Sequence, residues 1–141
     1  MLRQMLGRKA QLSLQPLLAE FLACTDLRLK LPTGNLHLDR QVAQLLVTRG
    51  RLAKLQLQIQ HYLMKEMPPQ TRQQLHTLLH GTRDLLQLAD SLIFLAEEYL
   101  LDPEGSIACL RQINKRKLNL LAQIQRSLAV TTDVGAIGQQ L

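Results

Sequence analysis

The chain has 141 residues, which suits one domain with a substantial hydrophobic core and leaves no room for a second domain of ordinary size. Hydrophobic residues make up 46% of the sequence and aromatic residues only 3%, so aliphatic side chains must fill the interior, while the scarcity of β-branched runs and period-two alternation argues against a β-sheet. The formal net charge of +6 suggests an anionic partner, but the basic residues are scattered without interleaved aromatic residues, so no nucleic-acid partner is expected.

Pro and Gly interrupt the chain in three places and divide it into four predicted helices. The interruptions are Leu31-Pro32-Thr33-Gly34-Asn35, Met67-Pro68-Pro69 and Asp102-Pro103-Glu104-Gly105-Ser106. The helices are predicted at about 13–25, 36–66, 70–101 and 103–129. Asp102 before Pro103 predicts an N-cap followed by proline at the first helical position, so that connection is very short and its helices are antiparallel neighbours.

The predicted fold is therefore an all-α, up-and-down antiparallel bundle of three long helices, with the shorter N-terminal helix covering part of one groove. Residues 1–130 are expected to form this single helical-bundle domain. Residues 131–141 contain two Gly and have little periodicity, which predicts a flexible C-terminal tail.

The second predicted helix has an apolar seam that two polar residues interrupt. Its members are Leu38, Val42, Leu45, Arg49, Leu52, Gln56, Ile59 and Leu63. We expect Arg49 to extend outward on its aliphatic stem. The alternative is an ion pair with Asp84 or Asp90, which would give those aspartates a structural role.

The third predicted helix carries two adjacent apolar tracks, so it must pack against at least two other helices. The first track consists of Leu75, Leu78, Leu85, Ala89, Leu92, Ala96 and Tyr99. The second consists of Leu79, Leu86, Ile93 and Leu100. Asp84 and Asp90 lie in the middle of this helix, where Asp is a poor helix former, and they are the best functional lead.

The fourth predicted helix contains the densest basic set, which is formed by Arg111, Lys115, Arg116 and Lys117. We expect these residues to form a solvated helix face, and a patch for an anion or a partner protein is the alternative. Cys24 and Cys109 are far apart among apolar neighbours, which favours two buried thiols in a reducing compartment. No apolar run approaches the ~20 residues of a membrane span, so a cytoplasmic protein is expected.

His76 and His80 are four residues apart, a spacing that can present two imidazoles to one metal, although a solvent-facing pair is expected. The segment 75–82 also resembles the phosphorylated segment of histidine phosphotransfer domains, which are four-helix bundles of similar length. That resemblance implies His76 or His80 as the phospho-acceptor. Leu79 stands where the family has Lys, and Gly81 is displaced by one position, so phosphotransfer in two-component signalling is kept as the alternative function.

The segment 82–92 resembles the signature of the PhoU family, in which an Asp or Asn, Leu, Glu, Arg, Ile, Gly and Asp follow one another on the middle helix of a three-helix unit. The matching residues are Asp84, Leu85, Ala89 and Asp90. The surrounding helices, about 36–130, resemble the PhoU-like cytoplasmic domain attached to bacterial sodium/phosphate cotransporters.

PhoU proteins hold metal ions with carboxylates one helical turn apart. Leu86 stands where the family has Glu, so the resemblance implies a reduced site for a single divalent, iron or zinc ion at Asp84, Asp90 and Glu97. Asp90 and Glu97 are seven residues apart and share a helix face. The alternative is a structural role for these carboxylates as caps or in ion pairs.

The resemblance implies a non-enzymatic accessory or regulatory domain in phosphate uptake, in the cytoplasm and peripheral to the inner membrane. Its expected partner is a membrane phosphate transporter or the regulatory proteins of one. Free-standing PhoU proteins carry two three-helix units and this length permits one, so a homodimer is expected. A generic helical protein-interaction module is a further alternative, and no nucleophile constellation or glycine-rich phosphate loop predicts an enzyme.

Overall fold

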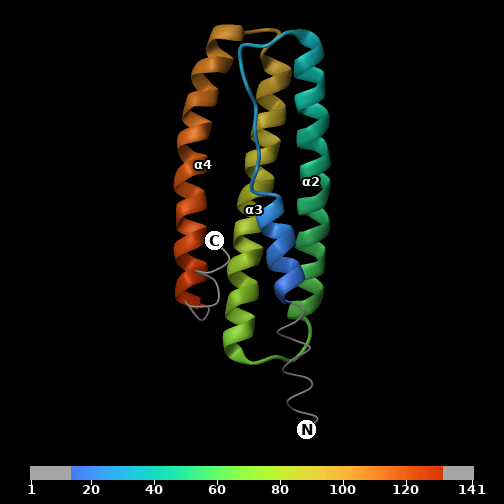
Figure 1. Cartoon of the computed structure of the whole chain (residues 1–141), viewed down its shortest axis with the longest axis vertical. Helices are drawn as coiled ribbons and strands as arrows, with labels where there is room; N and C mark the ends of the chain where they lie inside the picture. The colour runs from blue at the N-terminus through green and yellow to red at the C-terminus, as the bar shows by residue number, and fades with distance from the viewer. Residues whose placement is uncertain (1–13, 132–141) are drawn as a thin grey trace.

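The computed structural model describes residues 14–131, with side chains up to residue 128. Three long helices, α2 (Asn35–Leu63), α3 (Pro69–Glu98) and α4 (Pro103–Thr131), run alternately down, up and down the molecule (Figure 1). Residues 14–23 form a shorter helix that precedes them. The predicted all-α up-and-down bundle is confirmed, whereas the predicted tail at 131–141 lies, apart from Thr131, outside the described residues.

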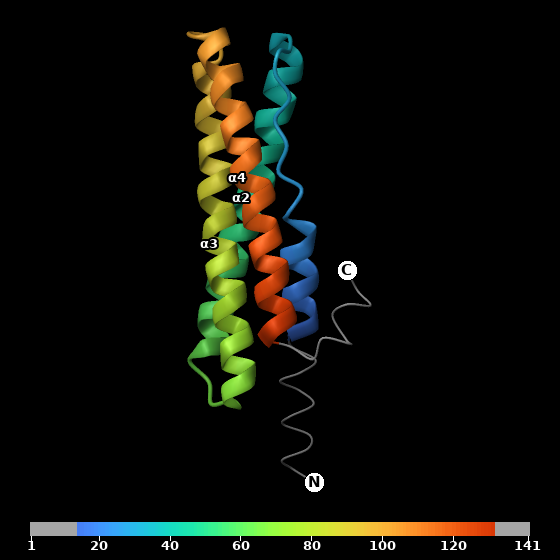
Figure 2. The same ribbon diagram turned by 90° about the vertical axis from the view of Figure 1, so that its left-hand side faces the viewer.

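The α3 helix is the centre of the bundle, because α2 and α4 both pack against it. The backbones of α2 and α4 do not approach each other within the described part of the chain. The N-terminal segment, residues 14–34, runs along the bundle between them, first as the short helix and then as an extended stretch (Figures 1 and 2). It therefore occupies the place of a fourth helix.

The extended stretch explains how so few residues cover so long a groove. A helix of 29 residues such as α2 is about 43 Å long at 1.5 Å per residue. The ten helical residues 14–23 span only about 15 Å, but extended residues advance up to about 3.3 Å each. The N-terminal segment, a short helix followed by extended chain, therefore matches the length of α2 with about 20 residues.

Buried residues seven apart form the core-facing side of α2, namely Leu38, Leu45, Leu52 and Ile59. Between them lie Thr48 and Leu55, which are also buried. The predicted seam was wrong at two positions, because Thr48 and Leu55 are the buried residues and Arg49 and Gln56 are not. Thr48 tolerates burial because its hydroxyl donates a hydrogen bond to the Gln44 carbonyl of the preceding turn.

The first predicted track of α3 is confirmed, since its members are buried and Tyr99 is partly buried. The second predicted track was only partly correct: Leu79 is buried, Leu86 and Ile93 are half-buried, and Leu100 is 63% exposed beyond the end of the helix. The other buried line of α3 consists of Gly81, Leu88 and Leu95. The central helix therefore buries more than one face, as its position requires.

The N-terminal segment is tied to α2 by two polar contacts. Arg51 donates two hydrogen bonds to the Glu20 carboxylate, at 2.7 and 3.0 Å. The side-chain amide of Gln41 accepts from the Lys30 backbone N–H at 2.5 Å and donates to the Lys30 carbonyl at 3.2 Å. One Gln side chain thus satisfies both backbone groups of a residue in extended chain.

The Arg51 guanidinium lowers the pKa of the Glu20 carboxyl below its usual range, so the ion pair stabilises the fold only while Glu20 is ionised. We expect Glu20→Gln to destabilise the protein near neutral pH. The difference in unfolding free energy between wild type and variant should shrink as the pH falls below about 4.3, the usual Glu value, and through the lower folded pKa. Chemical denaturation across this range measures it, and in an Arg51→Gln background the pH-dependent difference should disappear.

The short N-terminal helix packs its Phe21 side chain against a glycine of α3. Phe21 is fully buried, and a Cβ atom added to Gly81 would lie 3.0 Å from Phe21 Cζ and 3.4 Å from Ile124 Cδ1 of α4. The missing side chain of Gly81 is therefore what allows the aromatic ring to lie against α3 at this point.

Alanine substitutions at two helical glycines should have opposite effects. Gly81→Ala crowds a fully buried ring, which costs about 1–3 kcal/mol, and its gain in helix propensity of about 1 kcal/mol offsets this only in part. Gly50→Ala, in α2 with nothing near the added Cβ, should stabilise the protein by about 0.5–1 kcal/mol. Denaturant unfolding at low protein concentration measures both, and stabilisation by both substitutions would contradict the packing.

The connection between α3 and α4 has the predicted cap. The Asp102 carboxylate accepts a hydrogen bond from the Gly105 backbone N–H at 3.1 Å, and Pro103 is the first residue of α4. At the other end of the bundle, Arg72 donates to the carbonyls of Leu63 and Lys65, which closes α2 earlier than the predicted residue 66. None of the helices in residues 14–131 has the length and apolarity needed to cross a membrane.

Candidate functional site

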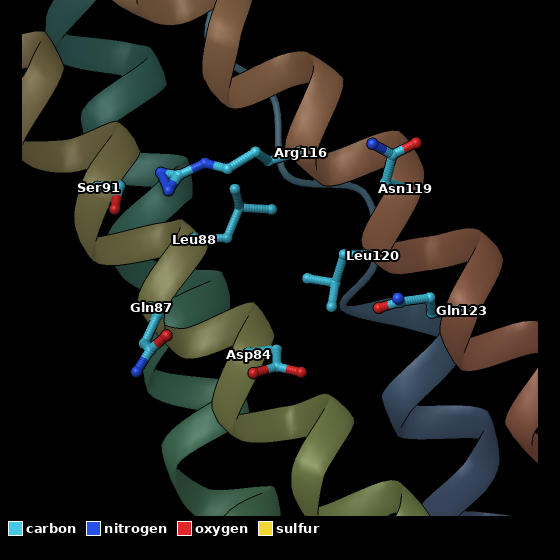
Figure 3. Close-up of a pocket in the computed structure, with 8 residues that line it drawn as sticks. All are labelled: Asp84, Gln87, Leu88, Ser91, Arg116, Asn119, Leu120 and Gln123. Carbon is cyan, nitrogen blue, oxygen red and sulfur yellow. The ribbon is translucent and has the colours of Figure 1, made fainter.

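A polar groove of about 440 Å³ lies between α3 and α4 and contains one residue from each of two predicted sets. Asp84 of α3 and Arg116 of α4 both line it, and Figure 3 shows them toward opposite ends. Arg116 extends across the groove toward Ser91, whereas Leu88 and Leu120 point toward each other between the two charged residues (Figure 3). The structure thus brings together two candidate residues that sequence reasoning had not connected.

The groove follows from matched spacings on two antiparallel helices. Its α3 wall consists of Asp84, Gln87, Leu88 and Ser91, and its α4 wall consists of Arg116, Asn119, Leu120 and Gln123. Each set has the offsets 0, 3, 4 and 7, which place four side chains on one helix face. Because the helices are antiparallel, Asp84 comes level with Gln123 and Ser91 comes level with Arg116.

This arrangement offers opposite charges at the two ends and neutral hydrogen-bonding groups between them. A guanidinium binds carboxylates or phosphates, a carboxylate binds ammonium groups, and Gln or Asn amides pair with peptide groups. The bidentate contact of Gln41 with Lys30 shows how an amide of this protein holds extended chain in a groove. A segment of extended peptide with charges of both signs matches the groove chemically.

Asp90 lies on another side of α3, where it forms an ion pair with Arg49 of α2. Arg49 extends outward and is exposed, as expected, but the structure also shows the alternative, its pairing with Asp90. Both side chains remain about half exposed, at 44% and 53%, so the pair lies at the surface between α2 and α3 and contributes little to stability. Asp90 thereby has the structural role that the sequence left open.

The predicted metal ligands are not brought together. Asp84 lines the α3–α4 groove, Asp90 pairs toward α2, and Glu97 is exposed further along α3. Within residues 14–131, no three His, Cys, Asp or Glu side chains are grouped as metal ligands would be. The six-residue separation of Asp84 and Asp90 turns them about 120° apart around the helix, which is the physical reason.

The two candidate phospho-acceptors, His76 and His80, are both exposed on α3, as the solvent-facing interpretation predicted. The neighbouring Gly81, however, faces the core and lies beneath the Phe21 ring. It therefore does not open a surface beside either imidazole, which agrees with its displacement by one position from the phosphotransfer pattern.

The four basic residues of α4 do not all face solvent, because they lie on different sides of the helix. Arg111, Lys115 and Arg116 are exposed, as predicted for a solvated face. Lys117 is instead half-buried and donates a hydrogen bond of 2.5 Å to the Leu27 carbonyl in the N-terminal segment, and burial lowers its pKa. The solvated-face prediction was therefore wrong for Lys117, which attaches the N-terminal segment to α4.

The cysteines also differ from each other. Cys24 is fully buried where the short helix ends, and burial raises the pKa of its thiol to about 11. Cys109 is exposed on α4, so the prediction of two buried thiols was wrong for it. The apolar neighbours of Cys109 in sequence face other directions on the helix.

Sequence reasoning missed four polar residues of the groove, which are Gln87, Ser91, Asn119 and Gln123. The signal that could have found them is the repeated pattern of polar residues around one leucine, at the same helical offsets in two predicted antiparallel neighbours. Fold and site together define a small helical bundle with a bipolar surface groove. Comparisons with protein-family models, curated proteins and solved structures find no match for this chain.

Proposed function

We propose that this chain is a non-enzymatic, PhoU-like accessory domain that regulates phosphate uptake in the cytoplasm, peripheral to the inner membrane. It binds an exposed segment of a membrane phosphate transporter, or of a protein that regulates one, and it acts as a homodimer. The observation that carries the proposal is the α3–α4 groove with Asp84 and Arg116 at its two ends.

Two features support docking through this groove. The first is that Asp84, which matches the leading acid of the PhoU signature, is exposed on the groove wall and not used inside the bundle. The second is the basic character of α4, where the exposed Arg111 and Lys115 lie near Arg116 in sequence and favour acidic residues in the part of the partner segment that lies at the Arg116 end. Asp90, one of the expected metal ligands, is paired with Arg49. Docking through the groove is therefore proposed without a bound metal.

The test is phosphate uptake in the source organism with the gene deleted and then restored. Wild-type protein should restore regulated uptake of radioactive phosphate, whereas the Asp84→Asn/Arg116→Gln variant should leave it close to the deletion strain. Both residues are exposed, so the variant should fold normally, and its net charge is unchanged because one charge of each sign is lost.

The matched control is Arg83→Gln/Glu104→Gln, which removes one exposed base from α3 and one exposed acid from α4 and leaves the groove lining intact. It should restore regulation as well as wild type does. Equal failure of both variants, or normal regulation in the groove variant, would refute docking through the groove. Acid-labile phosphate on His76 or His80 after incubation with a phosphorylated response regulator would favour the phosphotransfer alternative instead.

A further inference from the structure

The α2 helix has a second apolar face on the side opposite the core. At seven-residue intervals this outward stripe contains Leu36, Ala43, Gly50, Leu57 and Met64, all of them exposed. Leu46 and Val47 widen it, at 52% and 58% exposure. No other described segment lies beyond α2 on this side (Figure 1). A helix at the surface of a monomer normally has a single apolar stripe, directed at the core.

The other two long helices do not share this property. Among the described residues, α3 and α4 each expose one large hydrophobic side chain, Phe94 and Leu118, whereas α2 exposes four. From residue 43 to residue 57, Lys54 is the sole charged residue on the outward side of α2 that is not paired across the bundle. An apolar centre with charged residues nearer the N-terminal end of the stripe, Asp39 and Arg40, resembles the apolar core and polar rim of an interface.

The outward stripe is complementary to itself in one orientation. When two copies of α2 cross in opposite directions at Gly50, residues whose numbers add up to 100 come level with each other. Gly50 then faces Gly50 of the other copy, Ala43 faces Leu57, and Leu36 faces Met64. On both sides of the close contact at Gly50, the small Ala43 of one copy therefore faces the large Leu57 of the other. The seven-residue spacing keeps the two helices in contact along their length.

Charge selects the same orientation. In a parallel pair, Lys54 would face Lys54, Arg40 would face Arg40, and the small residues would face each other across a gap. In the antiparallel pair, Lys54 comes level with Leu46, and Arg40 comes level with the neutral Gln60. The antiparallel arrangement therefore removes the like-charge contacts of Lys54 and Arg40. Arg49 does come level with Arg51, but each of these arginines is paired within its own copy, with Asp90 and Glu20 respectively.

We propose that two copies of this chain associate through the outward stripe of α2, antiparallel and centred on Gly50. This specifies the homodimer of the proposed function and leaves the α3–α4 groove of each copy free. The stripe is about 43 Å long and about 10 Å wide, or roughly 430 Å² for each copy. Stable dimers bury about 800 Å² for each partner, so the association is weak and depends on concentration.

The first measurement is the mass of the full-length protein in solution by sedimentation equilibrium, from about 10 µM to about 1 mM. The wild type should shift from 16.0 kDa toward twice that mass. Leu57→Glu should remain monomeric, while Leu118→Glu, at an equally exposed leucine of α4, should dimerise like wild type. Neither substitution touches the core, so both variants should fold.

Disulfide cross-linking in a Cys109→Ser background tests the orientation. Ala43→Cys and Leu57→Cys should form few covalent dimers when each is oxidised alone, because in the antiparallel pair the like positions are about 21 Å apart. An equal mixture of the two variants should form the mixed dimer. Cross-linking of each variant with itself would indicate a parallel pair and would overturn the proposal, as would a constant monomer mass.

The outcomes for dimer and docking can be separated. A monomeric protein whose Asp84→Asn/Arg116→Gln variant still loses regulation would refute the dimer and leave the groove function standing. A dimer of the predicted geometry, together with normal regulation by the groove variant, would support the dimer and refute docking through the groove.

Discussion

Replacing Phe21 by alanine should destabilise the protein by about 3–5 kcal/mol, the largest effect that we expect from any single substitution. Phe21 is fully buried, and its ring lies against Gly81 of α3 and near Ile124 of α4. Alanine would leave a cavity where the N-terminal segment, α3 and α4 meet. The surrounding helices cannot close that cavity fully, because each of them is also fixed by its other contacts. Denaturant unfolding followed by circular dichroism measures the loss.

The other phenylalanine of the chain provides the control. Phe94 is 62% exposed on α3, so Phe94→Ala should change the unfolding free energy by no more than about 0.5 kcal/mol. Small domains are stable by about 5–15 kcal/mol, and Phe21→Ala could leave the protein too unstable to measure. Phe21→Leu, which keeps most of the apolar contact, should then give an intermediate loss. Equal effects of Phe21→Ala and Phe94→Ala would contradict the packing of the N-terminal segment.

Much of the fold could be predicted from the sequence because its interruptions are strong and local. Pro68, Pro69 and Pro103 cannot continue a preceding helix, and Asp102 is suited to cap the next one. Helix identity and order therefore followed from a few residues. The ends differed by two or three residues where contacts from another helix, such as those of Arg72, decided where the helix closes.

The N-terminal segment was predicted less well, although its sequence contains a usable signal. Leu27 and Leu29 are buried, Leu31 is partly buried, and Arg28 and Lys30 between them are exposed. This alternation is typical of extended chain that lies on an apolar surface. It is too short to indicate a strand of a sheet, and no propensity rule states that an extended stretch can replace a helix in a bundle.

The inward position of Thr48 was missed for a related reason. A polar residue is usually expected at the surface. A Thr hydroxyl, however, can donate a hydrogen bond to a carbonyl of its own helix, as Thr48 does, and can then be buried. The same applies to Thr82, which is fully buried and donates to the Leu78 carbonyl. The expected seam of α2 therefore passed through Arg49, while the buried residue is its neighbour Thr48.

The candidate site depended on distances that the sequence does not contain. Asp84 and Asp90 are close in sequence and appeared to form one feature, but α3 has neighbours on several sides and separates them. Asp84 faces α4, while Asp90 pairs with Arg49 of α2. A motif on a central helix is therefore divided among the partners of that helix, and it remains one site only where a single neighbour contacts all of its residues.

The two native cysteines should differ in alkylation rate by at least about 100-fold, and Cys24 should report how often the N-terminal segment leaves the bundle. Cys109 is exposed and should react at once. Cys24 is fully buried, its pKa is raised to about 11, and its thiol contacts Glu20, so it can react only when the segment opens. Mass spectrometry after timed iodoacetamide treatment at pH 8 measures both rates.

Two arginines of α2 make the experiment specific. Arg51→Gln removes the ion pair with Glu20, which is worth up to about 1 kcal/mol, and should raise the Cys24 rate about twofold to fivefold. Arg49→Gln breaks an ion pair of similar exposure that connects α2 to α3 and does not involve the segment, so it should leave the Cys24 rate unchanged. Equal acceleration by both substitutions would mean that Cys24 is exposed by unfolding of the whole bundle. Acceleration by Arg51→Gln alone would show that the N-terminal segment opens as a unit while α2, α3 and α4 remain packed.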